Sequence, residues 1–233
     1  MGDWDIISEE ASIVLVGNMN PKIFHPEWLI RKEIVADWDY SQKNNGIVIL
    51  PDMAQIELPD ELKMTVLLEQ FSIRSSRASE HLSLQDMIVN IFTLLAETPI
   101  AKMGMNYTSI IKIEDIDKWK KFGLNLAPQQ QWKEAAQFIN DLDEEKQKEL
   151  GLWELTMNLP RPDDFDGYIR SKIAVFPQAG QNTLSFNINN HIEIRDKSAE
   201  TMINILEEHW ANSLDLAKTL TENIMESQLR DQS

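Results

Sequence analysis

The chain has 233 residues, of which 38 are acidic and 22 basic, so its formal net charge is −16. This length fits one large domain or two small ones, and an apolar fraction of 42% is enough to bury a core. The absence of cysteine excludes disulfides, thiolate nucleophiles and cysteine-ligated metal sites. The longest apolar run, Ile13 to Val16, is far shorter than the ~20 residues of a membrane span. We therefore expect a cytoplasmic protein that does not enter a membrane.

The negative charge is concentrated in residues 1–10, 134–166 and 196–233. Residues 134–166 alone carry ten acids against three bases, a net charge of −7. Nucleic-acid binding depends on Lys and Arg that neutralise phosphates, so we expect no direct contact with nucleic acid. Such an acidic surface either docks on a basic protein, imitates a nucleic acid, or only keeps the chain in solution.

The first part of the chain is expected to alternate short strands with two helices. Pro26 suits the first turn of the first helix, and Ser83 with Asp86 resembles a capping box at the start of the second. Apolar alternation changes phase near Glu69, which predicts one long strand with a bulge. In chain order we expect a strand at 11–16, a helix at 27–35, a turn at 43–46, strands at 47–50, 55–58 and 62–75, and a helix at 83–95.

The second part repeats this order and ends in a long helix. Ser198 is expected to cap that helix, which runs for about thirty residues, or ~45 Å. The other elements expected are a strand at 100–113, a helix at 115–122, an interrupted acidic helix at 130–149, and strands at 152–159, 168–176 and 184–194. Runs of strands followed by helices indicate an α+β fold: mainly antiparallel sheet, amphipathic helices on one face and a long C-terminal helix.

The expected organisation is a single α+β domain over 11–229, preceded by an acidic N-terminal arm at 1–10. Residues 123–166, rich in acids and prolines, are either a seam or a mobile segment within this domain. Trp4 and Ile6 lie in the otherwise charged arm, which is therefore either a docking arm or disordered.

No motif identifies a cofactor or metal. None of the four histidines has the spacing of a helical ligand pair, and no phosphate-binding glycine loop or nucleophile elbow is present. A composite hydrolase-like site is conceivable only if the fold brings His25 and Glu27 to Asn189 and His191. Asparagines 187, 189 and 190, rare in strands, are either a recognition surface or a bulge.

Tryptophan and acidic side chains are the candidates for an interface, because a buried aromatic anchor inside a charged rim is typical of binding hot spots. The residues selected are Trp4, Ile6, Trp153, Trp210, Asp143, Glu144, Glu145, Asp163 and Asp164.

Several segments resemble a widespread set of uncharacterised bacterial proteins with no assigned reaction. They are GNMNP at 17–21, FHPEWL at 24–29, TPIAKMGMN at 98–106, FGLNLAP at 122–128, GYIR at 167–170 and NNH at 189–191. The likeness spans about 11–224 and implies an ordered single domain, but transfers no catalytic residue. It also implies an accessory role, in bacterial defence or toxin–antitoxin neighbourhoods.

These observations favour a non-enzymatic interaction module that works as a homodimer or as a subunit beside a basic partner protein. The alternatives are the hydrolase-like enzyme and the acidic mimic of nucleic acid. A fold by itself does not decide among them.

Overall fold

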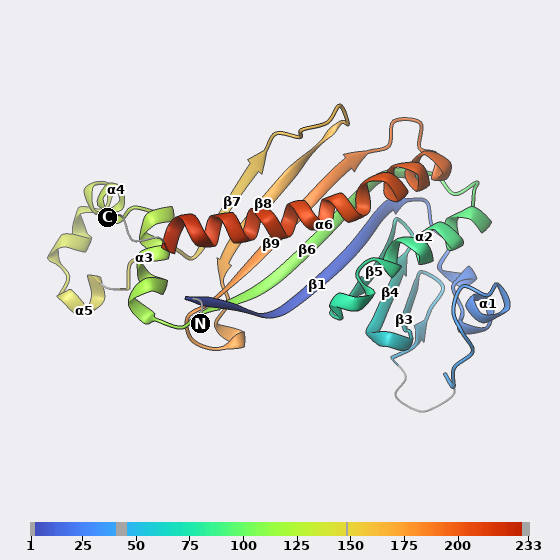
Figure 1. The fold of residues 1–233 in the computed structure, drawn as a ribbon, viewed down its shortest axis with the longest axis horizontal. Helices are drawn as coiled ribbons and strands as arrows, with labels where there is room; N and C mark the ends of the chain where they lie inside the picture. Colours follow the sequence, from blue (N-terminus) through green and yellow to red (C-terminus); the bar gives the residue numbers. More distant parts are fainter. Residues whose placement is uncertain (1–2, 41–45, 148, 230–233) are drawn as a thin grey trace.

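The computed structural model describes residues 3–40, 46–147 and 149–229 of the chain, and its helices and strands are shown in Figure 1. The elements, with η for a 3-10 helix, are β1 (Trp4–Gly17), η1 (Pro21–Ile23), α1 (Pro26–Arg31), β2 (Val48–Ile49), β3 (Met53–Glu57), η2 (Pro59–Glu61), β4 (Leu62–Leu67), β5 (Gln70–Ser75), η3 (Ala78–Glu80), α2 (Ser83–Leu94), β6 (Ile100–Ile113), α3 (Ile116–Leu126), α4 (Gln129–Ala135), η4 (Gln137–Asp141), α5 (Glu144–Gln147), β7 (Glu154–Leu159), β8 (Gly167–Val175), η5 (Pro177–Ala179), β9 (Thr183–Glu193) and α6 (Ala199–Leu229).

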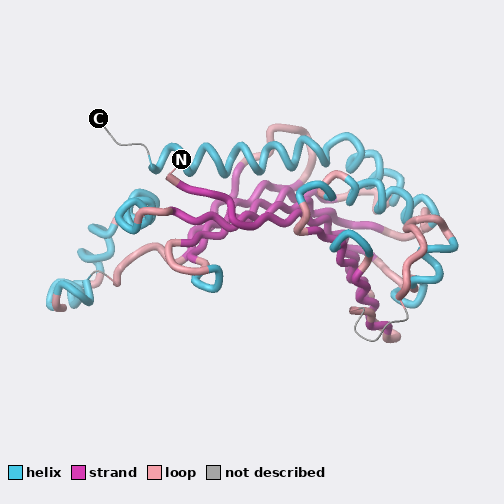
Figure 2. The backbone as a smooth tube through the Cα atoms, turned by 60° about the horizontal axis from the view of Figure 1, so that its bottom comes forward, coloured by secondary structure: helices cyan, strands magenta, loops and turns pink. Residues whose placement is uncertain are grey.

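The described strands form one antiparallel sheet in the order β2-β3-β4-β5-β1-β6-β9-β8-β7. Helices α2 and α6 lie on one face, and the opposite face of the central strands carries no long helix (Figures 1 and 2). The expected α+β class, with antiparallel sheet and a long C-terminal helix, is thus confirmed. None of the described helices combines the length and apolar character needed to cross a membrane.

Two halves of the chain follow the same path. Each half begins with a long central strand, β1 or β6, continues through a helical insertion and further strands, and ends with a helix, α2 or α6, on the same face. Outward from the centre, the first half runs β1-β5-β4-β3-β2 and the second runs β6-β9-β8-β7. The insertion of the first half is short (η1 and α1), whereas that of the second half comprises α3, α4, η4 and α5.

Alternation along the central strands separates the two faces of the sheet. Ile13 and Leu15 of β1 lie opposite Met105 and Met103 of β6, and all four are buried beneath the helices. Val14 between them faces the uncovered side and is only partly buried. The core therefore forms on one face of the sheet, as the two-residue period of a strand requires.

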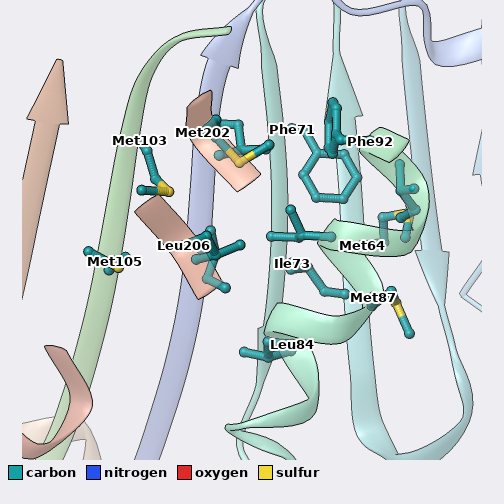
Figure 3. Close-up of a cluster of buried hydrophobic side chains, with 14 of the residues drawn as sticks. Met64, Phe71, Ile73, Leu84, Met87, Phe92, Met103, Met105, Met202 and Leu206 are labelled. Carbon is teal, nitrogen blue, oxygen red and sulfur yellow. The ribbon is translucent and has the colours of Figure 1, made fainter. Parts of the chain in front are cut away.

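The helices complete this core with apolar side chains from both halves. Figure 3 shows Met202 and Leu206 of α6 beside Met103 of β6, with Phe92 of α2 beside Phe71 of β5. The Phe71 and Phe92 rings meet edge to face at 5.3 Å, a favourable aromatic geometry.

A second apolar cluster lies towards the C-terminal end of α6. It contains Met225 and Leu229 of that helix, Phe122 of α3 and Phe186 of β9.

Strands β1 and β6 carry polar side chains on this face as well: the Tyr107 hydroxyl donates to Glu9. Burial raises the pKa of Tyr107, and the Glu9 carboxylate raises it further, so this group stays protonated and continues to donate.

The long helix begins and packs largely as expected. The N–H of Thr201 donates to the hydroxyl of Ser198 at 3.3 Å, which confirms the predicted cap. Trp210 is fully buried, and its indole N–H donates to the carbonyl of His81 at 2.8 Å. A predicted interface residue thus fixes α6 to the segment before α2.

Three local predictions differ from the structure. The phase change near Glu69 is the turn of a hairpin between β4 and β5, not a bulge in one strand. The Ser83 hydroxyl donates to the Glu80 carbonyl, and α2 has no side-chain cap. Residues 4–10, expected as an arm, belong to β1 and pair with β6. Of the expected turn at 43–46, residues 43–45 lie outside the described residues.

His81 makes the stability of this core sensitive to acid. Its side chain is buried, both ring nitrogens lack a partner in the described residues, and burial lowers its pKa. Below the unfolded-state pKa of about 6.5, the unfolded chain therefore binds the proton first, and the free energy of unfolding falls as the pH falls. We expect His81→Phe to reduce the slope of the free energy of unfolding against pH, between pH 6.5 and 5, by up to about 1.4 kcal/mol per pH unit. Urea unfolding at several pH values measures it; identical slopes in both proteins would contradict it.

Candidate functional site

The structure does not bring the four residues of the hypothetical hydrolase site together. His25 caps α1, where its Nδ1 accepts from the N–H of Glu27 at 3.2 Å. The adjacent Phe24 packs on Phe71, on the helix-covered face of the sheet. Asn189 and His191 lie on β9, opposite Asn106 and Gly104 of β6, and face the uncovered side. The two pairs thus occupy different faces, separated by several strands.

On the uncovered face, His191 is part of a stack of polar rings. It lies 4.7 Å from the Tyr168 ring at 17°, and Arg170 lies over Tyr168 at 4.4 Å. His191 Nε2 meets the Glu193 carboxylate at 2.9 Å, and Lys102 donates to the same oxygen at 3.0 Å. These hydrogen bonds, the one from His191 first, hold the pKa of Glu193 below its ordinary value.

Ion pairs between neighbouring strands continue across this uncovered face. They join Lys63 to Glu57, Arg74 to Glu10, Lys102 to Glu193, and Lys172 to Glu154. Such exposed pairs contribute little stability and leave little net charge. Groups of three or more His, Asp or Glu side chains able to hold a metal ion are absent from the described residues. The uncovered face has the character of a solvated surface.

The three asparagines of β9 do not form a single surface. By register Asn187 and Asn189 face the uncovered side, where Asn187 donates to Thr108 at 2.8 Å. Asn190 points the other way, is buried, and donates to Ser213 of α6 at 3.1 Å. The strand keeps its pairing throughout, so there is no bulge here.

Asp163, predicted as an interface residue, forms an internal ion pair. Arg161 donates to both of its carboxylate oxygens, at 2.7 and 2.8 Å, and its guanidinium side chain is only 5% exposed. The same guanidinium donates to Asn190 and to the carbonyl of His191. Hydrogen bonding from Arg161 holds the pKa of Asp163 below its ordinary value. Asp164 beside it is exposed.

The remaining interface candidates lie in different environments. Trp4 is partly buried against the second apolar cluster, whereas Ile6 and its neighbour Ile7 are 41% and 46% exposed. Trp210 is buried in the core, as described above. Trp153, in contrast, is 72% exposed, immediately before β7.

Trp153 belongs to a region that combines exposed aromatic and acidic side chains. We call residues 116–159 (α3, α4, η4, α5 and β7) the distal end: α3, α4 and α5 lie at one extremity of the molecule, and the edge strand β7 follows them in the chain (Figure 1). Trp132 and Phe138 are 60% and 67% exposed there, and Met157 is 52% exposed. The predicted acids Asp143, Glu144 and Glu145 are exposed at and beside α5. Large apolar side chains exposed to solvent, together with acids, make this segment the candidate for an interaction site.

The distal end, together with β8 and β9, lines a half-open cavity of about 830 Å³. Apolar side chains dominate its wall, and the charged residues around it are Lys120 of α3, Lys133 of α4, Glu144 of α5 and Glu149. The residues around it are Trp119, Lys120, Phe122, Gly123, Leu124, Gln129, Lys133, Glu144, Gln147, Glu149, Leu150, Gly151, Leu152, Trp153, Val175 and Leu184. The buried indole N–H of Trp119 has no partner in the described residues, so this wall holds an unsatisfied donor.

Sequence reasoning identified Trp153 and the acids of this region, but missed Trp132, Phe138, Met157 and the cavity. The available signal was the polar surroundings of Trp132 and Phe138, since residues 129–131, 133–134, 137 and 140–141 are all polar or charged. Comparison with known proteins adds no assignment: neither the family models nor the curated proteins gave a match to this chain.

The pair between Arg161 and Asp163 predicts a structural rather than a binding role. Arg161→Ala leaves Asp163, Asn190 and a backbone carbonyl without their donor, so we expect it to lower the free energy of unfolding by about 3 kcal/mol or more. Arg195→Ala is the matched control: Arg195 pairs with Asp166 but is 80% exposed, and we expect a loss below about 1 kcal/mol. Urea unfolding of both variants measures the difference. Equal losses would show that the Arg161 pair is no stronger than a surface pair.

Proposed function

We propose that the protein is a non-enzymatic interaction module whose distal end binds a basic partner protein. The observation that carries this proposal is the coincidence of an apolar cavity, exposed aromatic side chains and acidic residues in 116–159. An aromatic or aliphatic side chain of the partner would enter the cavity, while its Lys or Arg residues would meet the acidic surroundings.

The distribution of charge supports a basic rather than an acidic or neutral partner. The most acidic segment, 134–166, covers α5 and β7 and supplies seven of the sixteen residues around the cavity, among them Glu144 and Glu149. Attraction at this surface speeds the encounter with a positive partner and disfavours negative ones. The partner is either a different protein or a second copy that presents a basic surface.

The two other functions have less support. A hydrolase-like site would require residues that lie on different faces of the sheet. A mimic of nucleic acid requires a row of carboxylates, but those of the uncovered face alternate with Lys and Arg in ion pairs. The resemblance supports a setting for this interaction in bacterial defence or a toxin–antitoxin operon.

Selection of random displayed peptides on the immobilised full chain tests this function. We expect the enriched peptides to combine Lys or Arg with Trp, Phe or Leu. Trp153→Ser should weaken their binding by about 2 kcal/mol, or roughly 30-fold, because it removes an exposed aromatic anchor. Glu144→Lys and Glu149→Lys should weaken it most at low salt.

Matched controls lie outside the distal end. Leu82→Ser removes another exposed apolar side chain (60%), and Glu207→Lys reverses an exposed charge on α6. Neither is expected to change peptide binding measurably. The proposal fails if no peptides are enriched, or if their binding responds to the controls as strongly as to the distal-end variants.

A further inference from the structure

Strand β7 is an edge of the sheet, and its backbone has a free side. In the register of β7 and β8, Trp153 lies opposite Val175, and the N–H of Val175 donates to the carbonyl of Trp153 at 3.0 Å. In an antiparallel strand, the backbone N–H and C=O groups of successive residues point to opposite sides. Residues 155, 157 and 159 therefore turn theirs towards β8, as Trp153 does. Residues 154, 156 and 158 therefore turn theirs away from the sheet.

The other side of β8 agrees with this alternation. The N–H of Glu193 in β9 donates to the carbonyl of Asp166 at 2.9 Å, so the even-numbered positions of β8 face β9 and the odd-numbered ones face β7. The outward row of β7 thus presents N–H and C=O groups at three alternate residues, over a strand about 20 Å long.

Natural sheets usually protect such an edge, and the other edges described here are protected. Strand β2 has only two residues, and the part of β1 that pairs with β6 alone contains a register shift between Ile6 and Ser8. Strand β7 lacks these protections: it has six residues and an unbroken register. It also contains no Pro or Lys, and Glu154 is its one charged residue. An unprotected edge is a template for a further strand.

We propose that an extended basic segment of the partner adds to β7 as a further strand, antiparallel or parallel, and so continues the sheet. This inference rests on the proposed function and specifies how the partner binds. Its charge follows from the acidic segment 134–166 that contains the strand. Trp153 lies immediately before β7 and in the cavity wall, so a segment running along this edge would deliver a side chain to the cavity. Main-chain hydrogen bonds would supply affinity, and that side chain specificity.

A backbone variant separates strand addition from binding in the cavity alone. Thr156→Pro removes an N–H that faces away from β8, a position where an edge strand tolerates proline. Thr156→Val is the control, because it keeps the N–H and the β-branched shape. The probe is a synthetic peptide of about ten residues that alternates Lys and Val around one Trp, long enough to span β7. We expect Thr156→Pro, but not Thr156→Val, to bind it about tenfold more weakly.

Residue-resolved amide hydrogen exchange gives a second readout on the unaltered chain. The amides of Glu154, Thr156 and Asn158 should exchange rapidly in the free protein and slow down when the peptide binds. A version of the peptide with alternate amides N-methylated should bind more weakly and leave these three amides unprotected.

Each other result overturns the inference in a distinguishable way. If Trp153→Ser weakens binding but Thr156→Pro does not, and the three amides stay unprotected, the partner uses the cavity alone and only strand addition is wrong. A peptide that fails to bind the unaltered chain contradicts strand addition, and with failed peptide selection the proposed function falls too. If light scattering shows a dimer that Thr156→Pro dissociates, the added strand belongs to a second copy instead.

Discussion

The pairing of β1 with β6 is the constraint on which the rest of the structure depends. These two 14-residue strands are the longest in the sheet, and each half of the chain is built outward from one of them. Their alternation fixes which side chains face α2 and α6 and which face the uncovered side. Strand β5 pairs with only the later part of β1, from Ala11 to Val16, so the two halves are offset along the centre. The 31-residue helix α6 spans this offset and contributes to both apolar clusters.

The similar path of the two halves indicates where they differ, and the candidate site lies at the largest difference. After the central strand, the first half inserts η1 and α1, and Phe24 and Leu29 of this segment are buried in the core. The second half inserts α3 to α5, which fold back only in part: Phe122 is buried, whereas Trp132 and Phe138 remain exposed. The first insertion therefore serves packing, and the second leaves apolar surface exposed where the proposed partner would bind.

Periodicity predicted the fold class and the bounds of β6, β9 and α6 well, because long runs of alternating or helical pattern leave few choices. It failed at Leu68 and Glu69, because a hairpin turn and a bulge both shift the parity of a strand, and neither residue carries turn chemistry. The candidate site was predicted only in part. Whether a tryptophan is buried depends on the element packed against it. Trp210 lies on the inward side of α6 and contacts the segment before α2, whereas Trp153 precedes an edge strand.

Charge decides between the two surfaces that a partner could use. On the uncovered face, Lys and Arg of one strand pair with Glu of another, as in the pairs of Lys102 with Glu193 and Lys172 with Glu154. These pairs satisfy the face internally, so a ligand there would have to displace them. The later part of the distal end, residues 134–159, carries seven acids against two bases, and Trp132, Phe138 and Trp153 of the distal end are exposed. Desolvating that surface would yield apolar burial and bring the proposed basic partner close to an excess of acids, so both terms would favour the proposed binding.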